Sequence, residues 1–304
     1  MKYHFILERH VRYSVMNQCR VLEVSRSGYY QWRHRMLAHP QELPQRQREN
    51  GELLKRSRAI YVKYHRRYGS PRITRILREE GYRCSRNRIA RLMQEDRMVA
   101  RPKRRFTVTT QSDHRKASPN LLDRNFRVLK PNAALTSDIT YVETRQGWLY
   151  VATVMDLCTR KIIGLAMRAD LSQELVIDAL RQAIVRTNPT PGVMIHSDRG
   201  VQYSSDAYRA ILHEHGFRQS MSRKGNCWDN APMESFFKTM KVELVYEHRY
   251  ETRSDAARSI FEYIEVFYNR QRMHSALNFQ SPEAFEASFN QSSTTAPKAE
   301  SPVH

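Results

Sequence analysis

The most constraining feature of the sequence is a change of apolar periodicity close to residue 134. Three short apolar segments with strand-like composition follow one another there, separated by tight turns: 134–143, 148–156 and 161–167. Helical spacing begins after Ser172 and again after Ser205, and each of these helices precedes a further strand-like segment, at 192–196 and 216–222. The first three segments predict an antiparallel meander, and strands connected by helices require at least one parallel pair. We therefore predict an α/β domain with a mixed five-stranded sheet and flanking helices.

One more helix is predicted within GNCWDNAPMESFFKTMKVELVY, which runs from Gly225 to Tyr246. Asp229 or Asn230 can cap it, and Pro232 is tolerated in its first turn. Its apolar stripe consists of Met233, Phe236 or Phe237, Met240 and Leu244. Its other face carries Glu234, Lys238 and Lys241. Taken alone, this face is explained equally well by a solvated surface with a weak ion pair.

Charge is distributed very unevenly along the chain. The sequence contains 51 Lys and Arg against 31 Asp and Glu, a formal net charge of +20, and all of the excess lies in residues 1–130. A basic half beside a neutral half indicates a module that binds a polyanion, with nucleic acid as the first candidate. Arginine predominates over lysine, which suits contacts to phosphates and base edges. The alternative is a cationic surface that serves only solubility.

The basic half contains a pattern typical of a helix-turn-helix. Three helices are predicted between 51 and 97, with Ser70 capping the second and Pro71 at its first position, Gly81 ending it and Ser85 capping the third. The outer side of the third helix carries the candidate DNA contacts Arg86, Arg88 and Arg91. A generic three-helix bundle without DNA-binding function remains the alternative.

These patterns divide the chain into five parts. We expect a short helical N-terminal segment at 1–45, whose aromatic cluster (Tyr29, Tyr30 and Trp32) forms either a small core or a stacking surface. An all-α helix-turn-helix domain follows at 46–100 and a basic linker at 101–122. The α/β domain with a C-terminal helical tail is expected at 123–290, and a disordered tail at 291–304.

Several protein classes are disfavoured by composition. No run approaches the roughly 18 apolar residues that span a bilayer, and the first residues lack the pattern of a signal peptide. The four cysteines form no C-x-x-C pair, so neither a disulfide framework nor a Cys-rich zinc site is predicted. We expect a reducing, cytoplasmic location without a membrane partner.

Three carboxylates in the neutral half are candidates for metal chemistry. Asp138 lies in the middle of an apolar strand, Asp198 at the end of another, and Glu234 on the helix described above. Taken singly, Asp138 could face outward at an edge and Asp198 could form a turn. Together they could converge, and ligands that are all oxygen suit Mg²⁺ or Mn²⁺. Two such ions would serve phosphodiester chemistry, with Lys238 and Lys241 holding DNA phosphates beside them.

Other polar residues near these positions have simpler explanations. Asp156 follows a strand and precedes a turn, which favours a structural role. Asp229 is interpreted as a helix cap rather than a ligand. His196 could contact the site, but strand alternation does not determine which face it occupies.

Three blocks, LTSDITYVET, HSDRGVQYSS and GNCWDNAPMESFFKTMKVELVY, closely resemble the catalytic blocks of DDE-type insertion-sequence transposases. Between Asp198 and Glu234 lie 35 residues, the D-x35-E spacing that this group shares with retroviral integrases. The segment from Tyr268 to Leu277 with Ser281-Pro282 resembles the tail block of the same group. The resemblance is closest to the second reading-frame product (OrfB) of the insertion-sequence-three group, and it covers about 51 to 287.

The resemblance implies an RNase-H-like catalytic core and an integrase-type reaction, in which DNA is cleaved at element ends and a 3′ hydroxyl is joined to target DNA. It implies that Asp138, Asp198 and Glu234 form the metal-binding triad, with Mg²⁺ or Mn²⁺, as two ions, as cofactor. Lys241, seven residues after the glutamate, matches the basic residue of the family at that position. The tail block is expected to serve packing, since Phe261, Ile264 and Phe267 form an apolar stripe before it.

The partners implied are DNA, both element ends and target, and further copies of the chain assembled on that DNA. In this group an upstream reading frame normally supplies a heptad region, which this chain lacks, so its product is a further expected partner. The expected location is the bacterial cytoplasm, in association with the nucleoid. Two alternatives remain: a DNA-binding regulator with an inactive RNase-H-like domain, and a nuclease that cleaves without strand transfer.

Overall fold

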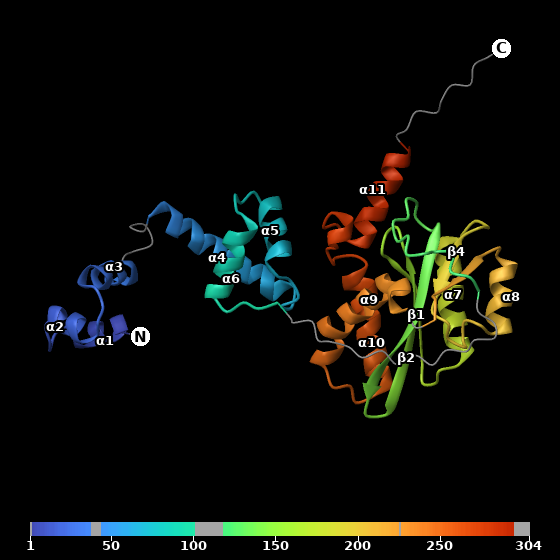
Figure 1. Cartoon of the computed structure of the whole chain (residues 1–304), viewed down its shortest axis with the longest axis horizontal. Coiled ribbons are helices and arrows are strands. Elements are labelled where there is room, and N and C mark those ends of the chain that lie inside the picture. Colours follow the sequence, from blue (N-terminus) through green and yellow to red (C-terminus); the bar gives the residue numbers. More distant parts are fainter. Residues whose placement is uncertain (1, 38–43, 101–117, 225, 295–304) are drawn as a thin grey trace, which may run out of the picture. The chain divides into compact units, whose positions relative to one another are not determined.

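The computed structural model describes residues 2–37, 44–100, 118–224 and 226–294, and these fall into two compact units, divided after residue 100 (Figure 1). Most of the predicted basic linker at 101–122 lies outside the described residues, as do Gly225 and residues 295–304 of the predicted disordered tail. No helix in the described ranges is both long and apolar enough to cross a membrane.

The N-terminal segment is helical, as expected. It consists of α1 (Lys2–Arg9), α2 (Val15–Val21) and α3 (Arg26–Leu37). Ser25 starts α3 by accepting the Gly28 N–H at 2.9 Å. Tyr29 is fully buried among these helices with Ile6 and Cys19, whereas Tyr30 is 46% exposed. The aromatic cluster is therefore mainly a small core.

A second group of helices matches the predicted helix-turn-helix: α4 (Gln45–Lys63), α5 (Ser70–Glu79) and α6 (Arg86–Glu95). α5 and α6 pack on each other and on α4 through a core of Leu53, Ile60, Ile73, Leu77, Ile89, Leu92 and Met93. Ser85 caps α6 by accepting the Arg88 N–H at 3.2 Å, and Gly81 follows α5 with a φ of 89°. The predicted cap of α5 is wrong, since Gly69 occupies that position and Ser70 is already helical.

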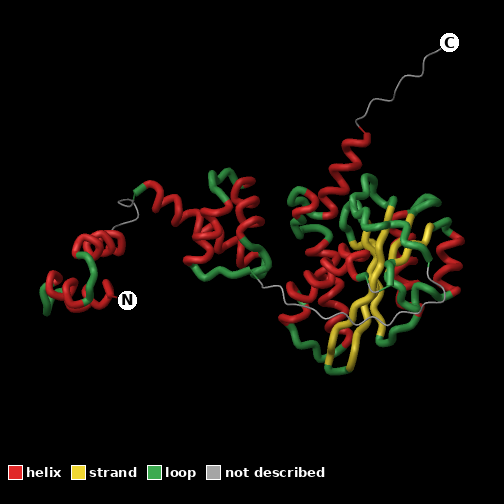
Figure 2. Tube along the Cα trace, in the orientation of Figure 1, coloured by secondary structure: helices red, strands yellow, loops and turns green. Residues whose placement is uncertain are grey.

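The unit after residue 100, which we call the catalytic unit after the activity expected of it, contains the predicted five-stranded mixed sheet, in the order β3-β2-β1-β4-β5. Its strands are β1 (Ala134–Thr144), β2 (Gly147–Asp156), β3 (Ile162–Arg168), β4 (Met194–Ser197) and β5 (Arg218–Met221). β1, β2 and β3 form the antiparallel meander, and β4 is parallel to both β1 and β5. Figure 2 shows the long β1–β2 hairpin extending beyond the short strands β4 and β5.

Helices cover both faces of this sheet. α7 (Gln173–Thr187) and α8 (Asp206–Glu214) lie on one face, and α9 (Ala231–Glu243) and α10 (Arg253–Glu262) on the other (Figure 1). α7 approaches β3 so closely that a Cβ on Gly164 would lie 2.1 Å from the Ala179 carbonyl oxygen. The main core forms between α7, α8 and the sheet, from residues such as Leu135, Val154, Leu180 and Leu212. This core makes the sheet a rigid support for side chains on its other face.

The C-terminal segment differs from its prediction in two details. α10 continues as a π-helical turn, η3 (Tyr263–Tyr268). Phe261, in the last turn of α10, is 49% exposed, whereas Ile264 and Phe267 in η3 are buried. Phe261 therefore does not belong to the buried stripe. α11 (Pro282–Thr294) extends into the first residues of the segment expected to be disordered.

Candidate active site

Two of the three candidate carboxylates lie on neighbouring parallel strands. β1 and β4 pair in the register Thr136 to His196, so that Asp138 and Asp198, two residues further along each strand, come level with each other. β4 ends at Ser197, which places Asp198 at the carboxyl edge of the sheet, where open α/β sheets bind ligands. Each carboxylate accepts one nearby backbone N–H: Asp138 from Ile139 at 2.8 Å, and Asp198 from Gly200 at 2.9 Å.

The third carboxylate comes from the first turn of α9, which packs on β1. All predicted positions of its apolar stripe are buried, and Phe236 and Phe237 both contribute. Glu234 is exposed at the start of the helix and Lys238 is half-buried. The helix start is fixed by Asn230, whose Oδ1 accepts the Thr136 hydroxyl at 2.5 Å and whose Nδ2 donates to the Ser137 carbonyl at 3.3 Å.

The three carboxylates influence one another electrostatically. Burial raises the pKa of Asp138 well above its ordinary value, and the negative charges of Asp198 and Glu234 raise this pKa further. Burial also raises the pKa of Asp198. Partial desolvation of its carboxyl group raises the pKa of Glu234, although the residue as a whole is exposed, and the Lys238 ammonium group partly offsets this shift. Such a cluster is electrostatically unfavourable on its own, and a bound cation would relieve the repulsion.

Lys241 is not on a solvated face, contrary to what helical spacing suggested. It is only 7% exposed, its ammonium group lies 4.9 Å from the centre of the Tyr141 ring, and the positive charge acts on Asp138. Burial lowers the pKa of Lys241, whereas the Asp138 charge raises it. A buried lysine directed at an acidic cluster is a stronger sign of a site than a lysine in water.

The donor set suits a hard divalent cation, because every candidate ligand is a carboxylate oxygen. No group of three or more His, Cys, Asp and Glu side chains in the described ranges is already arranged to hold a metal ion. Asp138 and Asp198 are adjacent by strand register, and Glu234 lies on the helix that packs on β1. By their chemistry these three residues therefore fit such a cation.

Asp229 has a role that the sequence did not reveal, and it caps no helix. Its carboxylate is fully buried and accepts from Arg223 at 2.8 and 2.9 Å, from Arg124 at 2.9 Å and from Asn120 at 3.0 Å. Hydrogen bonds from Arg223 lower the pKa of Asp229 far below its ordinary value. This cluster joins the chain entering the domain to the loop before α9. The only sign of this role in the sequence is the frequency of arginine in the segments near Asp229.

Two other polar residues are structural. His196 is fully buried, with its ring nitrogens 2.8 Å from the Ser220 hydroxyl and 3.1 Å from the Ser222 hydroxyl, and burial lowers its pKa to about 4. It therefore joins β4 to β5 as a neutral ring. Asp156 accepts the backbone N–H groups of Asn132, Cys158 and Thr159, and so shapes the turn after β2 as expected.

The tail block packs against the catalytic unit and holds α9. Asn269 forms two hydrogen bonds of 2.9 Å with the backbone of Ile162 on β3. Arg272 forms a buried ion pair with Glu243 at 2.8 Å, and the same carboxylate accepts the Tyr263 hydroxyl at 2.8 Å. Because Glu243 is the last residue of α9, the tail fixes that helix at the end opposite Asn230.

The three arginines predicted to contact DNA have different surroundings on α6. Arg86 is exposed. Arg91 is 52% exposed and lies 3.7 Å from Glu95. Arg88 is only 19% exposed and binds α4, with hydrogen bonds of 2.8 Å to Asn50 and 3.1 Å to Glu49. Arg86 and Arg91 are thus available to a ligand, whereas Arg88 holds α6 to α4.

Comparison with family models matches two kinds of domain. An integrase core domain matches residues 129–227, and a second integrase core model matches residues 215–282. An HTH-like domain matches residues 47–106. The catalytic domain of bovine immunodeficiency virus integrase is 13% identical, with a TM-score of 0.41 over 54% of this chain and 99% of that one. That similarity is too low to add to the assignment.

Sequence relatives extend over nearly the whole chain. The transposase InsF of insertion sequence IS3A from Escherichia coli K12 is 39% identical, covering 94% of this chain and 98% of its own. The 31 kDa protein of insertion element IS600 from Shigella sonnei is 42% identical, covering 90% and 98%. The transposase of IS904 from Lactococcus lactis is 38% identical, covering 80% and 97%. With its HTH-like domain and its integrase core, the chain belongs to the IS3 family of insertion-sequence transposases.

Proposed function

We propose that this protein catalyses transposition: it cleaves DNA at the ends of an insertion sequence and joins the freed 3′ hydroxyl to a target phosphodiester. The observation that carries the proposal is the placement of Asp138 and Asp198 level with each other on adjacent parallel chain segments, with Glu234 on a helix packed on β1. The reaction class, polynucleotidyl transfer, follows from the integrase core, and the roles of individual residues are our inference.

In this proposal the three carboxylates hold divalent metal, Mg²⁺ or Mn²⁺, as two ions. When bound, the ions would activate the attacking oxygen and stabilise the leaving oxygen of the phosphodiester. Lys241 balances the charge of Asp138 and lies where a phosphate would approach the cluster. Lys238, which lies beside Glu234, supplies a second positive charge. Asn230 is a positioning residue, because it fixes the start of α9 against β1.

DNA is the proposed partner of both units. Arg86 and Arg91 would contact DNA from α6 and Lys238 and Lys241 from α9, whereas Arg88 acts by holding α6 in place. Assembly of several copies on DNA and cooperation with an upstream reading-frame product are parts of the same proposal. The proposal also includes a cytoplasmic location in association with the nucleoid, and the domain boundaries predicted above.

The test is a strand-transfer assay with pre-cleaved element ends, target DNA and Mg²⁺, with and without the upstream reading-frame product. The wild-type chain should form joined product, and Asp138→Asn, Asp198→Asn and Glu234→Gln should each lower the rate by at least about a hundredfold. Glu214→Gln, a change of an exposed carboxylate at the end of α8, is the control and should leave the rate unchanged.

Three other outcomes are distinguishable. If wild type and Glu234→Gln behave identically and neither joins DNA, the proposal fails. Nicking without joining would identify a nuclease. Binding of element DNA without either reaction would identify a regulator.

A further inference from the structure

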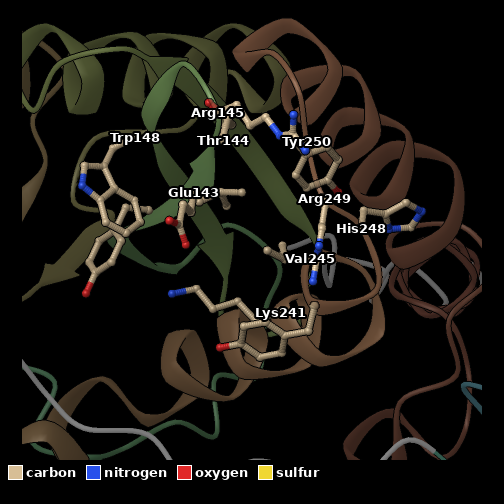
Figure 3. Close-up of a pocket in the computed structure, with 12 residues that line it drawn as sticks. Glu143, Thr144, Arg145, Trp148, Lys241, Val245, His248, Arg249 and Tyr250 are labelled. Atoms are coloured by element: carbon tan, nitrogen blue, oxygen red, sulfur yellow. The ribbon is translucent and has the colours of Figure 1, made fainter.

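A pocket lies at the far end of the β1–β2 hairpin (Figure 3). Lys241 contributes to its lining, but the reaction described above gives the pocket itself no role. Its volume is about 600 Å³, within the range of about 300–1,000 Å³ typical of sites for small ligands. Strands β1 and β2 form one side, and the end of α9 with the segment after it forms the other. The lining residues on which the argument depends are Tyr141, Glu143, Arg145, Trp148, Lys241 and Arg249.

The pocket exists because β1 is longer than the strand beside it. β4 pairs with β1 only over Ala134–Thr136. At the other end of β1 the chain after α9 closes the edge, with a bridge from Thr144 to Tyr250 and a bond of 3.0 Å from the Arg145 N–H to the Tyr250 carbonyl. Among the described strands, none pairs with this edge between these two points, so side chains there can meet a ligand.

One wall of the pocket is aromatic and open to solvent. Trp148 is 45% exposed and Tyr141 is 42% exposed, and their rings meet edge to face with centres 5.0 Å apart. The hairpin turn that carries Trp148 is held firmly, since the Trp148 carbonyl accepts from Arg253 of α10 at 2.9 Å. Gly147 has a φ of 101°, and a Cβ there would lie 2.9 Å from Arg253. An exposed aromatic pair on a fixed turn is suited to stacking against a flat ligand.

The other side of the pocket is positively charged. Lys241 extends from α9 towards β1, the strand that carries Glu143 (Figure 3). Arg249 is exposed. Arg145 forms only a solvent-exposed pair with Glu251, at 3.3 Å, which an anionic ligand could replace at little cost. Tyr141 and Lys241 line the pocket, and the elements that carry them, β1 and α9, also carry Asp138 and Glu234, so the pocket adjoins the acidic cluster.

We propose that this pocket receives one unpaired nucleobase of the DNA strand whose backbone lies at the acidic cluster. The base stacks on Trp148 and Tyr141, while Lys241, Arg145 and Arg249 neutralise the flanking phosphates. The Glu143 carboxylate accepts a hydrogen bond from an exocyclic amino group, which favours bases that carry one. The proposal rests on the proposed function for the identity of the ligand as DNA, but its test requires no catalysis.

The observations favour a nucleotide over an acidic peptide. Both would be attracted by the three cations, but a flat aromatic wall beside a phosphate-processing cluster matches a base with its phosphate. Base stacking on aromatic side chains contributes about 1–3 kcal/mol per base, so loss of one stacked base should weaken binding by about tenfold.

The experiment measures binding of the full chain, without divalent metal, to a duplex that carries a short single-stranded deoxycytidine tail, whose bases carry the exocyclic amino group. An abasic site replaces each tail deoxycytidine in turn. When the abasic site stands at the position whose base would enter the pocket, the wild type should bind the tail about tenfold more weakly than the intact tail. Trp148→Ala should bind the abasic and the intact tail equally well, whereas Trp148→Phe should retain most of the discrimination. Phe261→Ala removes an aromatic of similar exposure on α10 and should behave as wild type.

Several results would overturn the inference. If no abasic position weakens wild-type binding, or if Trp148→Ala shows the same penalty as wild type, the pocket holds no base. Displacement of the tail by polyglutamate, with binding of the polyglutamate lost in Trp148→Ala, would show that the pocket takes an acidic peptide instead. Joining activity without any abasic penalty would refute this inference alone. An abasic penalty without joining activity would refute the proposed function alone.

Discussion

At the scale of single residues, the main contrast is between carboxylates that are surrounded by hydrogen-bond donors and carboxylates that have few donors. Asp156 and Asp229 are almost fully buried, yet each is surrounded by donors. Asp138 and Asp198 are half-buried, each accepts one backbone N–H, and their neighbours include other carboxylates. Satisfied carboxylates stabilise the fold, whereas a cluster of like charges has an electrostatic cost that points to a function.

Asp229→Asn should destabilise the catalytic unit by about 2 kcal/mol, because hydrogen bonds between charged groups are replaced by weaker neutral ones. Urea unfolding of this unit provides the measurement. Asp123→Asn removes the exposed partner of the same Arg223, at 3.2 Å, and should have no measurable effect. Equal effects of the two changes would contradict a special role for Asp229.

Wild type and Asp229→Asn should also differ in how their stability depends on pH. Hydrogen bonds from Arg223 depress the folded-state pKa of Asp229, so its contribution is fully present above the unfolded pKa of about 4 and is lost as pH falls towards the folded value. The difference in unfolding free energy between wild type and Asp229→Asn should therefore be constant near neutral pH and shrink below about pH 4. A difference that grew on acidification would have the wrong sign.

At the scale of elements, α9 is held at both ends by polar side chains rather than by its apolar stripe alone. Asn230 fixes its start to β1, and Glu243 fixes its end to Arg272 and Tyr263 of the tail. Glu234 and Lys241 lie between these two anchors. The tail block thus serves packing, as expected, and this packing determines where the side chains of α9 lie.

Arg272→Ala should destabilise the catalytic unit by about 3–5 kcal/mol, because it leaves the buried Glu243 carboxylate without its charged partner. Lysine should not restore stability, because it cannot reproduce the guanidinium contacts to both oxygens of Glu243. Replacing both residues together, with Met and Leu, should be much less damaging than Arg272→Ala. Thermal or urea unfolding measures all three.

The control for this series is Arg270→Ala. Arg270 is 63% exposed and lies 3.6 Å from Glu283, so its loss should change stability little. If Arg270→Ala were as damaging as Arg272→Ala, the effect would come from the turn that follows η3 and not from the buried pair.

At the scale of the whole molecule, charge and chemistry are separated along the chain. The basic excess lies before residue 131, in the part that includes the HTH-like domain, and the acidic cluster lies in the integrase core. This separation fits a protein that binds DNA with one unit and reacts with it in the other.

Arg86→Ala and Arg91→Ala should each weaken binding to element DNA and reduce the slope of log K against log salt by about 0.9, the value for one released counterion. Binding measured across a series of salt concentrations tests this. Arg75→Ala, which removes an arginine of α5 already paired with Glu79 at 2.7 Å, is the control. Unchanged slopes for both α6 variants would contradict DNA contact by this helix. Arg88→Ala should instead destabilise the helix-turn-helix unit.

The sequence by itself determined the elements and their order, because apolar periodicity reports which face of each segment is buried. It also determined the family, through the spacing of Asp138, Asp198 and Glu234 within three characteristic blocks. It could not show that Lys241 is buried, that Asp229 is enclosed by arginines, or that Arg88 holds two helices together. Those properties depend on groups brought together from distant parts of the chain, such as Arg124 with Asp229 and Arg272 with Glu243.

The pocket at the hairpin shows the same division. Trp148 and Lys241 can be read in the sequence, but not their proximity. They come close because β1 extends beyond β4 and α9 ends beside the unpaired edge of β1. Strand length and helix spacing are local properties, set by propensity and hydrophobic pattern. Which charges become neighbours is set by packing, and only the tertiary structure decided it.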